Sequence, residues 1–302
     1  MEFTLEHPLG QHGCVPELQG HRGTTAVVTA AEAAGFSAIS FTEHPAPPRW
    51  WIDRGGHPSM DPLAALSFCA AVSTELRLMT HLLVLPYHRP LALAKTIATV
   101  DVLSSGRLIL GVGNGYLRAE FDALGIDFDQ RERYFHDTLQ TLHTVWRHNQ
   151  PPDASADDIM CEPAPRQLPH PPIWVGGSSR TARLRAAAFG QGWMPLMMPP
   201  RLARATRSAS LATVAELATA IRELTDFLGE RDRDPANFEI QVYAEESAIS
   251  SPYYSPAAHT DYIGRLTEAG ATRFVVRPSP AGTAQCLDSI AAYGETIVAV
   301  FS

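Results

Sequence analysis

The feature of this chain that most constrains its fold is a regular alternation of short apolar runs with longer helical patterns. Runs such as "LRLMTHLLVLP" read as strands that are too continuously apolar to have a face in water. Eight such runs occur, at 2–7, 36–44, 76–86, 107–115, 171–177, 192–197, 238–246 and 272–278. Strands buried on both faces and separated by helices indicate a parallel sheet. Eight strand–helix units in 302 residues predict an α/β fold, the closed (β/α)8 TIM barrel, although an open two-half sheet would give a similar pattern.

Capping signals place helices between these strands. Asp61 and Pro62 are a typical N-cap and first helical residue, and Gly35 and Gly106 follow the ends of two helical patterns. The helices that cover the barrel are expected at 24–35, 60–73, 89–106, 179–190, 210–229, 260–270 and 283–301.

One part of the chain breaks this rhythm after the fourth predicted strand. Residues 116–148 contain extra helical patterns, and residues 150–172 contain seven prolines. The barrel rhythm resumes directly afterwards, so this part is an insertion rather than a linker. We therefore expect a single domain over residues 1–302, with an insertion at about 116–172.

Composition excludes several classes of function. A net charge of −8 argues against a nucleic-acid-binding surface, which is normally basic. The start "MEFTLEHPLG" lacks the apolar core of a secretory signal, and no apolar run approaches the roughly 18 residues of a membrane span. The four cysteines lie far apart without a CxxC pair, which is typical of reduced thiols. We therefore expect a cytoplasmic protein with a small-molecule organic substrate and with neither nucleic acid nor membrane as partner.

Polar residues gather where a barrel would have its active site, at the carboxyl ends of the strands. The second predicted strand ends in Glu43 and His44, and the loop "PAPPRWW" follows. Thr80 and His81 interrupt the apolar third strand, where burial without partners would be costly. A lone strand-end histidine is more often a surface or capping residue than a catalyst. The adjacent acid and the aromatic loop nevertheless favour a catalytic His44.

In a second motif, "VGGSSRTARLRAAA", two glycines and two serines follow the fifth predicted strand, and a helical pattern begins directly after them. Free backbone N–H groups and the positive end of a helix are suited to an anion such as phosphate. The alternative is a plain turn with Ser178 or Ser179 as N-cap. Arg180, Arg183 and Arg185 on this helix would either contact the anion or face solvent.

Taken together, four stretches resemble the bacterial luciferase-like family, and more closely its branch of oxidoreductases that use the deazaflavin cofactor F420. They are "GFSAISFTEH", "LRLMTHLLVLPYHRPLALAKTIATVDVLSSGRLILGVGNGYLRAEFDALG", "RYFHDTLQTLHTVW" and "PPIWVGGSSRTARLRAAAFGQGWMP". They cover about residues 35 to 195, and the last hundred residues match only as barrel repeats.

The resemblance implies a TIM barrel, often homodimeric, with the cofactor ring in the barrel mouth and a nonprolyl cis peptide near His81-Leu82. His44 would transfer the proton coupled to hydride transfer, since histidine titrates near neutral pH, and Glu43 would orient or tune it. The cofactor residues it implies are Thr80, His81, Leu82, Asn114, Gly115, Tyr116, Gly176, Gly177, Ser178 and Ser179. The tryptophans proposed to shape the substrate pocket are Trp50, Trp51 and Trp193.

The chain also departs from this family. Glu43 stands where many relatives have aspartate, His81 where many have a small or amide residue, and Gln191 where an acid is common. Some relatives have a carboxylate proton donor in the fourth-strand loop, where this chain has Tyr116. His44, Glu43 and Tyr116 therefore all remain candidates for proton transfer.

Three other functions stay open at this point. One is an FMN-dependent monooxygenase on the same fold. Another is a metal-dependent hydrolase that uses His7, Glu43, His44 and His81, although no HxH pair ends the first strand and we expect no metal site. The third is a cofactor-binding protein without catalysis. Arg201, Arg204 and Arg207 would either meet an anionic cofactor tail or form a solvated basic loop.

Overall fold

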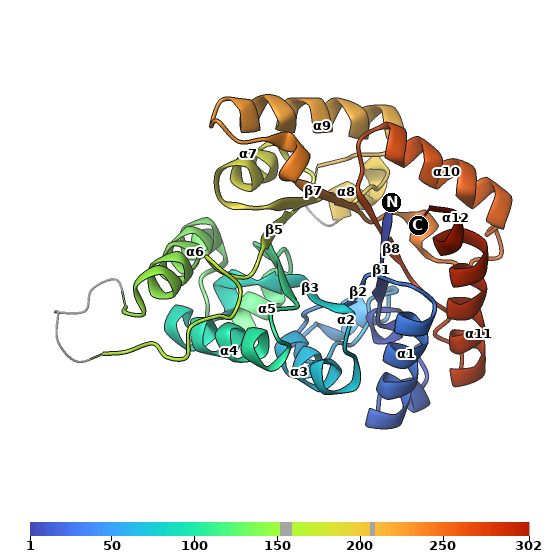
Figure 1. Cartoon of the computed structure of the whole chain (residues 1–302), viewed down its shortest axis with the longest axis horizontal. Coiled ribbons are helices and arrows are strands. Elements are labelled where there is room, and N and C mark those ends of the chain that lie inside the picture. Colours follow the sequence, from blue (N-terminus) through green and yellow to red (C-terminus); the bar gives the residue numbers. More distant parts are fainter. Residues whose placement is uncertain (152–158, 206–208, 302) are drawn as a thin grey trace.

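The chain folds into a closed barrel of eight parallel strands in the order β1 to β8 (Figure 1). The computed structural model describes residues 1–151, 159–205 and 209–301. The strands are β1 Glu2–Glu6, β2 Ala38–Phe41, β3 Arg77–Val84, β4 Leu108–Gly113, β5 Ile173–Gly176, β6 Gly192–Met194, β7 Glu239–Val242 and β8 Arg273–Val276. β1 pairs with both β2 and β8, which closes the barrel and rules out the open two-half sheet.

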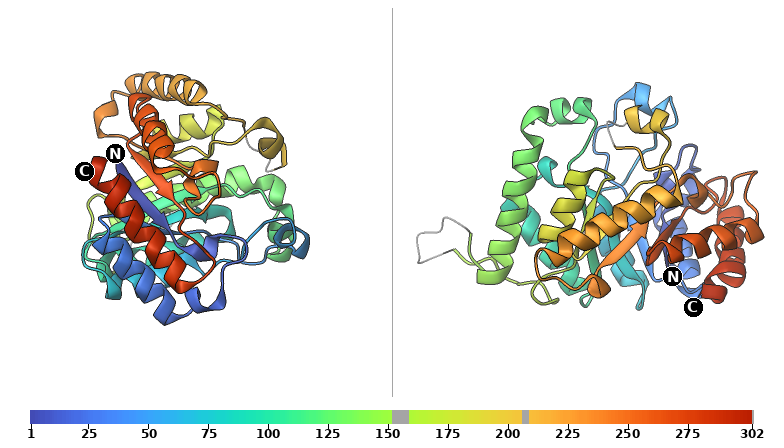
Figure 2. Two further views of the ribbon diagram at one scale, coloured as in Figure 1. Left: turned by 90° about the vertical axis from the view of Figure 1, so that its right-hand side faces the viewer. Right: turned by 90° about the horizontal axis from the view of Figure 1, so that it is seen from above.

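Helices surround the barrel on its outside (Figures 1 and 2). The main ones are α1 His21–Ala33, α3 Pro62–Val72, α4 Pro90–Leu103, α7 Arg180–Phe189, α9 Val214–Gly229, α10 Pro256–Glu268 and α11 Thr283–Tyr293. The Asp61 side chain accepts a hydrogen bond from the Ala64 backbone N–H, which confirms it as the N-cap of α3. The chain ends lie side by side, and the terminal amino group contacts the Phe301 carbonyl.

The predicted boundaries differ from the structure mainly in length. The second strand, expected at 36–44, spans only Ala38–Phe41, so Glu43 and His44 lie just beyond its carboxyl end. Between β4 and β5 the insertion carries α5 Arg118–Ala123 and α6 Arg131–His148. Two short α-helices were not expected from the sequence: α2 Arg49–Ile52 in the tryptophan loop and α8 Pro200–Ala205. The final turn, α12 Ala299–Phe301, falls within the helix expected at 283–301.

The inside of the barrel is filled by side chains that alternate along each strand. The Thr4 hydroxyl donates to the Gln241 amide oxygen at 2.7 Å, and the Gln241 amide nitrogen lies 3.4 Å from the Met79 sulfur. Met79 and Met194 also pack against Ile109 in a small buried cluster. These inward positions on β1, β3 and β7 fix which residues face the cavity above them.

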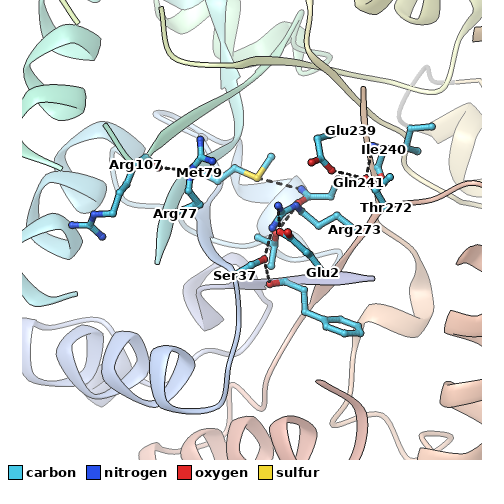
Figure 3. A network of polar contacts seen from close by, with 12 residues as sticks. Glu2, Ser37, Arg77, Met79, Arg107, Glu239, Ile240, Gln241, Thr272 and Arg273 are labelled. Atoms are coloured by element: carbon cyan, nitrogen blue, oxygen red, sulfur yellow. Dashed lines mark hydrogen bonds and ion pairs between the residues drawn. The ribbon is translucent and has the colours of Figure 1, made fainter. Parts of the chain in front are cut away.

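A buried arginine fills the amino-terminal end of the barrel. Arg273 begins β8, is 4% exposed, and its guanidinium contacts the Ser37 hydroxyl and the Glu2 carboxylate (Figure 3). The same group lies over the Trp174 ring at 5.3 Å. Because this end is packed with a paired charge, an open cavity is left to the opposite, carboxyl end of the strands.

Two buried histidines predict how stability depends on pH. Burial lowers the pKa of His7 to about 3 and that of His259 to about 4, so both are neutral in the folded protein at pH 6. Unfolded histidine titrates near 6.5, so below that pH the unfolded state binds protons that the folded state does not. As the pH decreases below about 6.5, we expect the free energy of unfolding to fall by up to about 1.4 kcal/mol per pH unit for each of these histidines.

Urea unfolding midpoints at pH 7 and pH 5 measure this loss. His259 lies in the core with its Nε2 3.0 Å from the Tyr293 hydroxyl, so His259→Gln should flatten the pH dependence. His136, which is exposed on α6, supplies the matched control His136→Gln. Equal slopes in the wild type and in His259→Gln would contradict the assignment.

In the part of the chain that the structure describes, every helix is too short or too polar to cross a membrane.

Candidate active site

A cavity of about 240 Å³ opens at the carboxyl ends of the strands. Eight residues expected at the site line it: Glu43, His44, His81, Leu82, Gly115, Tyr116, Gly177 and Ser178. The remaining wall comes from residues that were not predicted, among them Glu6, Val84, Met194, Leu196 and Tyr243. The walls are therefore largely apolar, with ionisable groups concentrated on the β1, β2 and β3 side.

His44 is held by a carboxylate from the insertion. Its Nδ1 lies 3.1 Å from Oε2 of Glu120, a residue of α5 that is 1% exposed. The same carboxylate accepts hydrogen bonds from the Tyr87 hydroxyl at 3.1 Å and from the Ala46 backbone N–H at 3.2 Å. Because Glu120 occupies Nδ1, the other ring nitrogen, Nε2, is the one left to exchange a proton with a ligand.

Glu43 does not orient His44, which corrects the sequence-based prediction. Its carboxylate accepts a hydrogen bond from the Val84 backbone N–H at 2.6 Å and lies 2.8 Å from His88 Nε2. Adjacent residues of an extended chain point to opposite sides, so Glu43 turns toward β3 while His44 turns toward α5. Glu43 thus ties β2 to β3, and the orienting carboxylate is Glu120.

Aromatic rings enclose the His44 imidazole. The ring of Trp51 lies 4.5 Å from it, that of His57 5.3 Å and that of Tyr116 6.2 Å. Burial and the charge of Glu120 raise the pKa of Tyr116 to about 12, so this phenol keeps its proton at neutral pH and can donate it in a hydrogen bond. Burial, the largest of several influences, lowers the pKa of His57.

A second carboxylate and imidazole meet inside the barrel. The side chains of Thr4, Met79 and Gln241 face into the barrel. The residues two positions further along the same strands, Glu6, His81 and Tyr243, share this inward direction and line the cavity. Glu6 Oε2 is 3.4 Å from His81 Nδ1, and the His81 and Tyr243 rings are 5.3 Å apart.

The Leu82 side chain packs over β4 and β5, because each of these strands has a glycine opposite it, Gly113 and Gly176. A Cβ at Gly113 or at Gly176 would come within 2.5 Å of the Leu82 side chain. The peptide bond between His81 and Leu82 is cis, at the position expected from the family resemblance. Leu82 lines the cavity, and Gly176 lies behind it, in contact with the Leu82 side chain.

The "GGSS" turn begins α7, and its hydroxyls are occupied within the protein. Ser179 is the N-cap of α7 and accepts from the Ala182 N–H, while the Ser178 hydroxyl donates to the Leu196 carbonyl at 2.7 Å. Arg180 and Arg183 both pair with Glu223 of α9. Arg185 pairs with Glu132 of α6. These hydroxyls and arginines are therefore engaged within the protein, and the Gly177 N–H of the turn also donates to the Met194 carbonyl.

Several residues predicted at the site lie elsewhere. Trp193 is fully buried, and its Nε1 donates to the Gly177 carbonyl; it points outward because its neighbour Met194 points into the barrel. Trp50 is 51% exposed under the Arg54 guanidinium. Thr80 is buried with its hydroxyl on the Gly111 carbonyl, and the Asn114 amide is held by Glu132.

The hydrolase alternative depended on a metal held by His7, Glu43, His44 and His81. His7 is buried, stacks on Phe41 with ring centroids 4.8 Å apart, and accepts the Leu9 N–H at Nδ1. Within residues 1–151, 159–205 and 209–301, no three or more His, Cys, Asp or Glu side chains form a group that could hold a metal ion.

The basic loop falls partly outside the described residues. Arg201 and Arg204 lie on α8 and are exposed, and Arg207 belongs to the part of the chain that is not described.

Comparison with known proteins relates this chain to luciferase-like monooxygenases. A family model for luciferase-like monooxygenases matches residues 1–250. The FMNH(2)-dependent dimethylsulfone monooxygenase of Pseudomonas putida is 32% identical over 120 residues, which is 37% of this chain and 33% of that one. The chain spans less than half the length of the curated relatives that it matches first.

Solved structures share the whole fold at low sequence identity. The monooxygenase RslO1 from Streptomyces bottropensis superimposes with a TM-score of 0.79 at 17% identity, covering all of both chains. The coenzyme F420-dependent tetrahydromethanopterin reductase from Methanopyrus kandleri superimposes with a TM-score of 0.73 at 16% identity, covering 100% of this chain and 99% of that one.

Proposed function

Because the chain belongs to the luciferase-like monooxygenase family, we propose that it is an oxidoreductase that uses coenzyme F420 to move a hydride to or from a small organic substrate. The observation that carries this proposal is the pairing of His44 with the buried Glu120 at the wall of a largely apolar cavity. Such a pair supplies a positioned proton carrier, which hydride transfer to or from a carbon–oxygen or carbon–nitrogen bond requires.

The residues present fit a flat cofactor with an anionic tail. Leu82, Met194 and Leu196 form apolar walls for a ring, and the glycines at 113 and 176 make room for Leu82. The "GGSS" turn at the start of α7 would hold a phosphate by its backbone N–H groups. When bound, F420 would supply the hydride chemistry.

The protein's own contribution is to hold and move one proton. Glu120 keeps the His44 ring in place through Nδ1, so Nε2 would give or take the proton. Tyr116 lines the same cavity and would donate a hydrogen bond to the substrate without losing its proton. Trp51 and His57 shield His44 from bulk water.

An FMN-dependent monooxygenase is the second candidate, favoured by the curated relative from Pseudomonas putida, whose name states FMNH(2) dependence. Fluorescence titration of the purified, cofactor-free protein with F420 and with FMN separates the two. We expect tight binding of F420; tight binding of FMN without binding of F420 would overturn the first choice.

The Glu120 carboxylate should act as a positioning residue. Glu120→Gln keeps the shape and an oxygen for the Ala46 N–H but removes the negative charge beside His44. We expect kcat to fall about 10- to 100-fold with little change in KM or in the cofactor dissociation constant. The exposed Glu230→Gln is the control. A change confined to KM would argue against this role.

We also propose that residues 1–302 form one domain with 116–172 as its insertion, and that the protein is a homodimer. Exposed apolar side chains on α3 and α4 support a dimer: Phe68, Leu91, Val102 and Leu103, the last 60% exposed. Leu103→Lys is expected to shift the mass measured by light scattering toward the monomer. A wild type that is monomeric at micromolar concentration would contradict the dimer.

A further inference from the structure

Glu6 is a buried carboxylate whose hydrogen bonds are incomplete. It is 1% exposed, and within the described part of the chain its Oε1 has no hydrogen-bond partner. Oε1 is covered by Gly10, where a Cβ would come within 2.7 Å of it. Because Glu6 lines the cavity while Oε1 is covered, Oε2 is the oxygen that faces the cavity.

Among the described residues, His81 is the one basic group within ion-pair distance of Oε2. Their contact is 3.4 Å long, yet His81 Nδ1 is itself without a hydrogen bond in the described structure. A buried carboxylate without a well-aligned donor costs several kcal/mol, and native proteins normally complete such groups. A hydrogen-bond donor on a ligand in the cavity would therefore complete the hydrogen bonding of the Glu6 carboxylate.

The carboxylates beside the cavity differ in whether their hydrogen bonds are complete. Glu43 is already satisfied by Val84 and His88, and Glu120 by Tyr87, Ala46 and His44. Glu6 is thus the carboxylate of this wall that still lacks a hydrogen bond. An anionic ligand group placed against it would be repelled, whereas an O–H or N–H group would make a charge-assisted hydrogen bond.

We propose that Glu6 is a specificity-determining residue, which accepts a hydrogen bond from a hydroxyl or ammonium group of the substrate and rejects substrates that place a carboxylate there. This role of Glu6 rests on the proposed function in one respect: the ligand that it binds is called a substrate. Glu6 and His81 come from the inner faces of β1 and β3, whereas His44 follows β2 and pairs with Glu120 of α5, so the two pairs occupy different parts of the wall of one cavity.

Benzyl alcohol, benzylamine and benzoate, which share one ring and differ in the polar group, test the proposal on cofactor-free protein. Dissociation constants from ligand-observed NMR should show the alcohol or the amine bound at least about tenfold more tightly than benzoate. The alcohol and amine arms tell whether a neutral or a charged donor is preferred. In Glu6→Leu the preference should fall to within about twofold.

Glu6→Gln is the companion variant, since it keeps the size of the side chain, removes only its charge, and should also weaken the preference. Glu239→Gln removes the same charge from the first residue of β7, where the carboxylate accepts the Thr272 hydroxyl, and should leave the preference intact. Absence of probe binding, a wild-type preference for benzoate, or full discrimination in both Glu6 variants would overturn the proposal.

The two proposals can fail separately. Probe binding is measured without cofactor, so a protein that binds neither F420 nor FMN would remove the proposed function but not the role of Glu6. Unchanged probe preference in the Glu6 variants, with normal F420 binding, would remove the role of Glu6 alone.

Discussion

Replacing His44 with alanine is expected to lower kcat about 10²- to 10⁴-fold while the protein still folds and binds its cofactor. The reason is geometric: His44 lines the cavity, and its Nδ1 is held by the buried Glu120, so the ring is a positioned proton carrier. The measurement is the oxidation or reduction of F420 followed by absorbance, with a substrate found by screening alcohols and amines.

The exposed His136→Ala is the matched control and should keep wild-type turnover. Cofactor titration of His44→Ala separates lost chemistry from lost binding: an unchanged dissociation constant with a low kcat supports proton transfer. Full turnover in His44→Ala would remove His44 from the mechanism. Tyr116, another hydrogen-bond donor that lines the cavity, would then be the next group to replace.

The architecture could be predicted because it depends on local patterns. Continuous apolar strands, capping residues and the spacing of strand–helix units are all visible in a single chain, and the closed order β1 to β8 confirms the barrel. Strand ends were less predictable, because they depend on where neighbouring strands stop pairing. β2 ends at Phe41, so Glu43 and His44 lie beyond the paired strand, where their side chains contact β3 and α5.

The site could be predicted where it depends on strand ends but not where it depends on long-range contacts. Glu120 sits in a short helix of the insertion, 76 residues from His44, and nothing local marks it as a partner. Trp193 is excluded from the pocket by the inward and outward alternation of β6, because its neighbour Met194 holds the inward position.

Glu6 carries a local signal that a sequence can show. An acid in the apolar run "FTLE" follows Thr4 by two residues, so it shares the inward face of the strand. A carboxylate on the inner face of a barrel strand cannot reach bulk water, and it therefore needs a partner or a ligand. The same alternation points to Tyr243, two residues beyond Gln241.

Gly111→Ala is expected to destabilise the protein by about 3 kcal/mol or more and to abolish cofactor binding. A Cβ at this position of β4 would lie 2.1 Å from the Thr80 carbonyl oxygen and 2.6 Å from the Met194 methyl. A backbone carbonyl cannot move aside as a flexible side chain can, so β3 and β4 must separate. That separation would break the hydrogen bond from the Thr80 hydroxyl to Gly111 at 2.8 Å.

The effect should reach the cavity, because the β3–β4 pairing shifts its register between Thr80 and Leu83, beside cavity-lining His81 and Leu82. Urea unfolding measures the loss of stability, and fluorescence titration measures cofactor binding. Gly264→Ala is the matched control: this glycine lies within α10, and a Cβ there would meet no neighbouring atom within 4 Å, so alanine should stabilise the protein by about 0.5 to 1 kcal/mol. Equal unfolding midpoints for the two variants would show that β4 tolerates a side chain at Gly111, and the close packing of β3 on β4 would then not be what shapes the cavity.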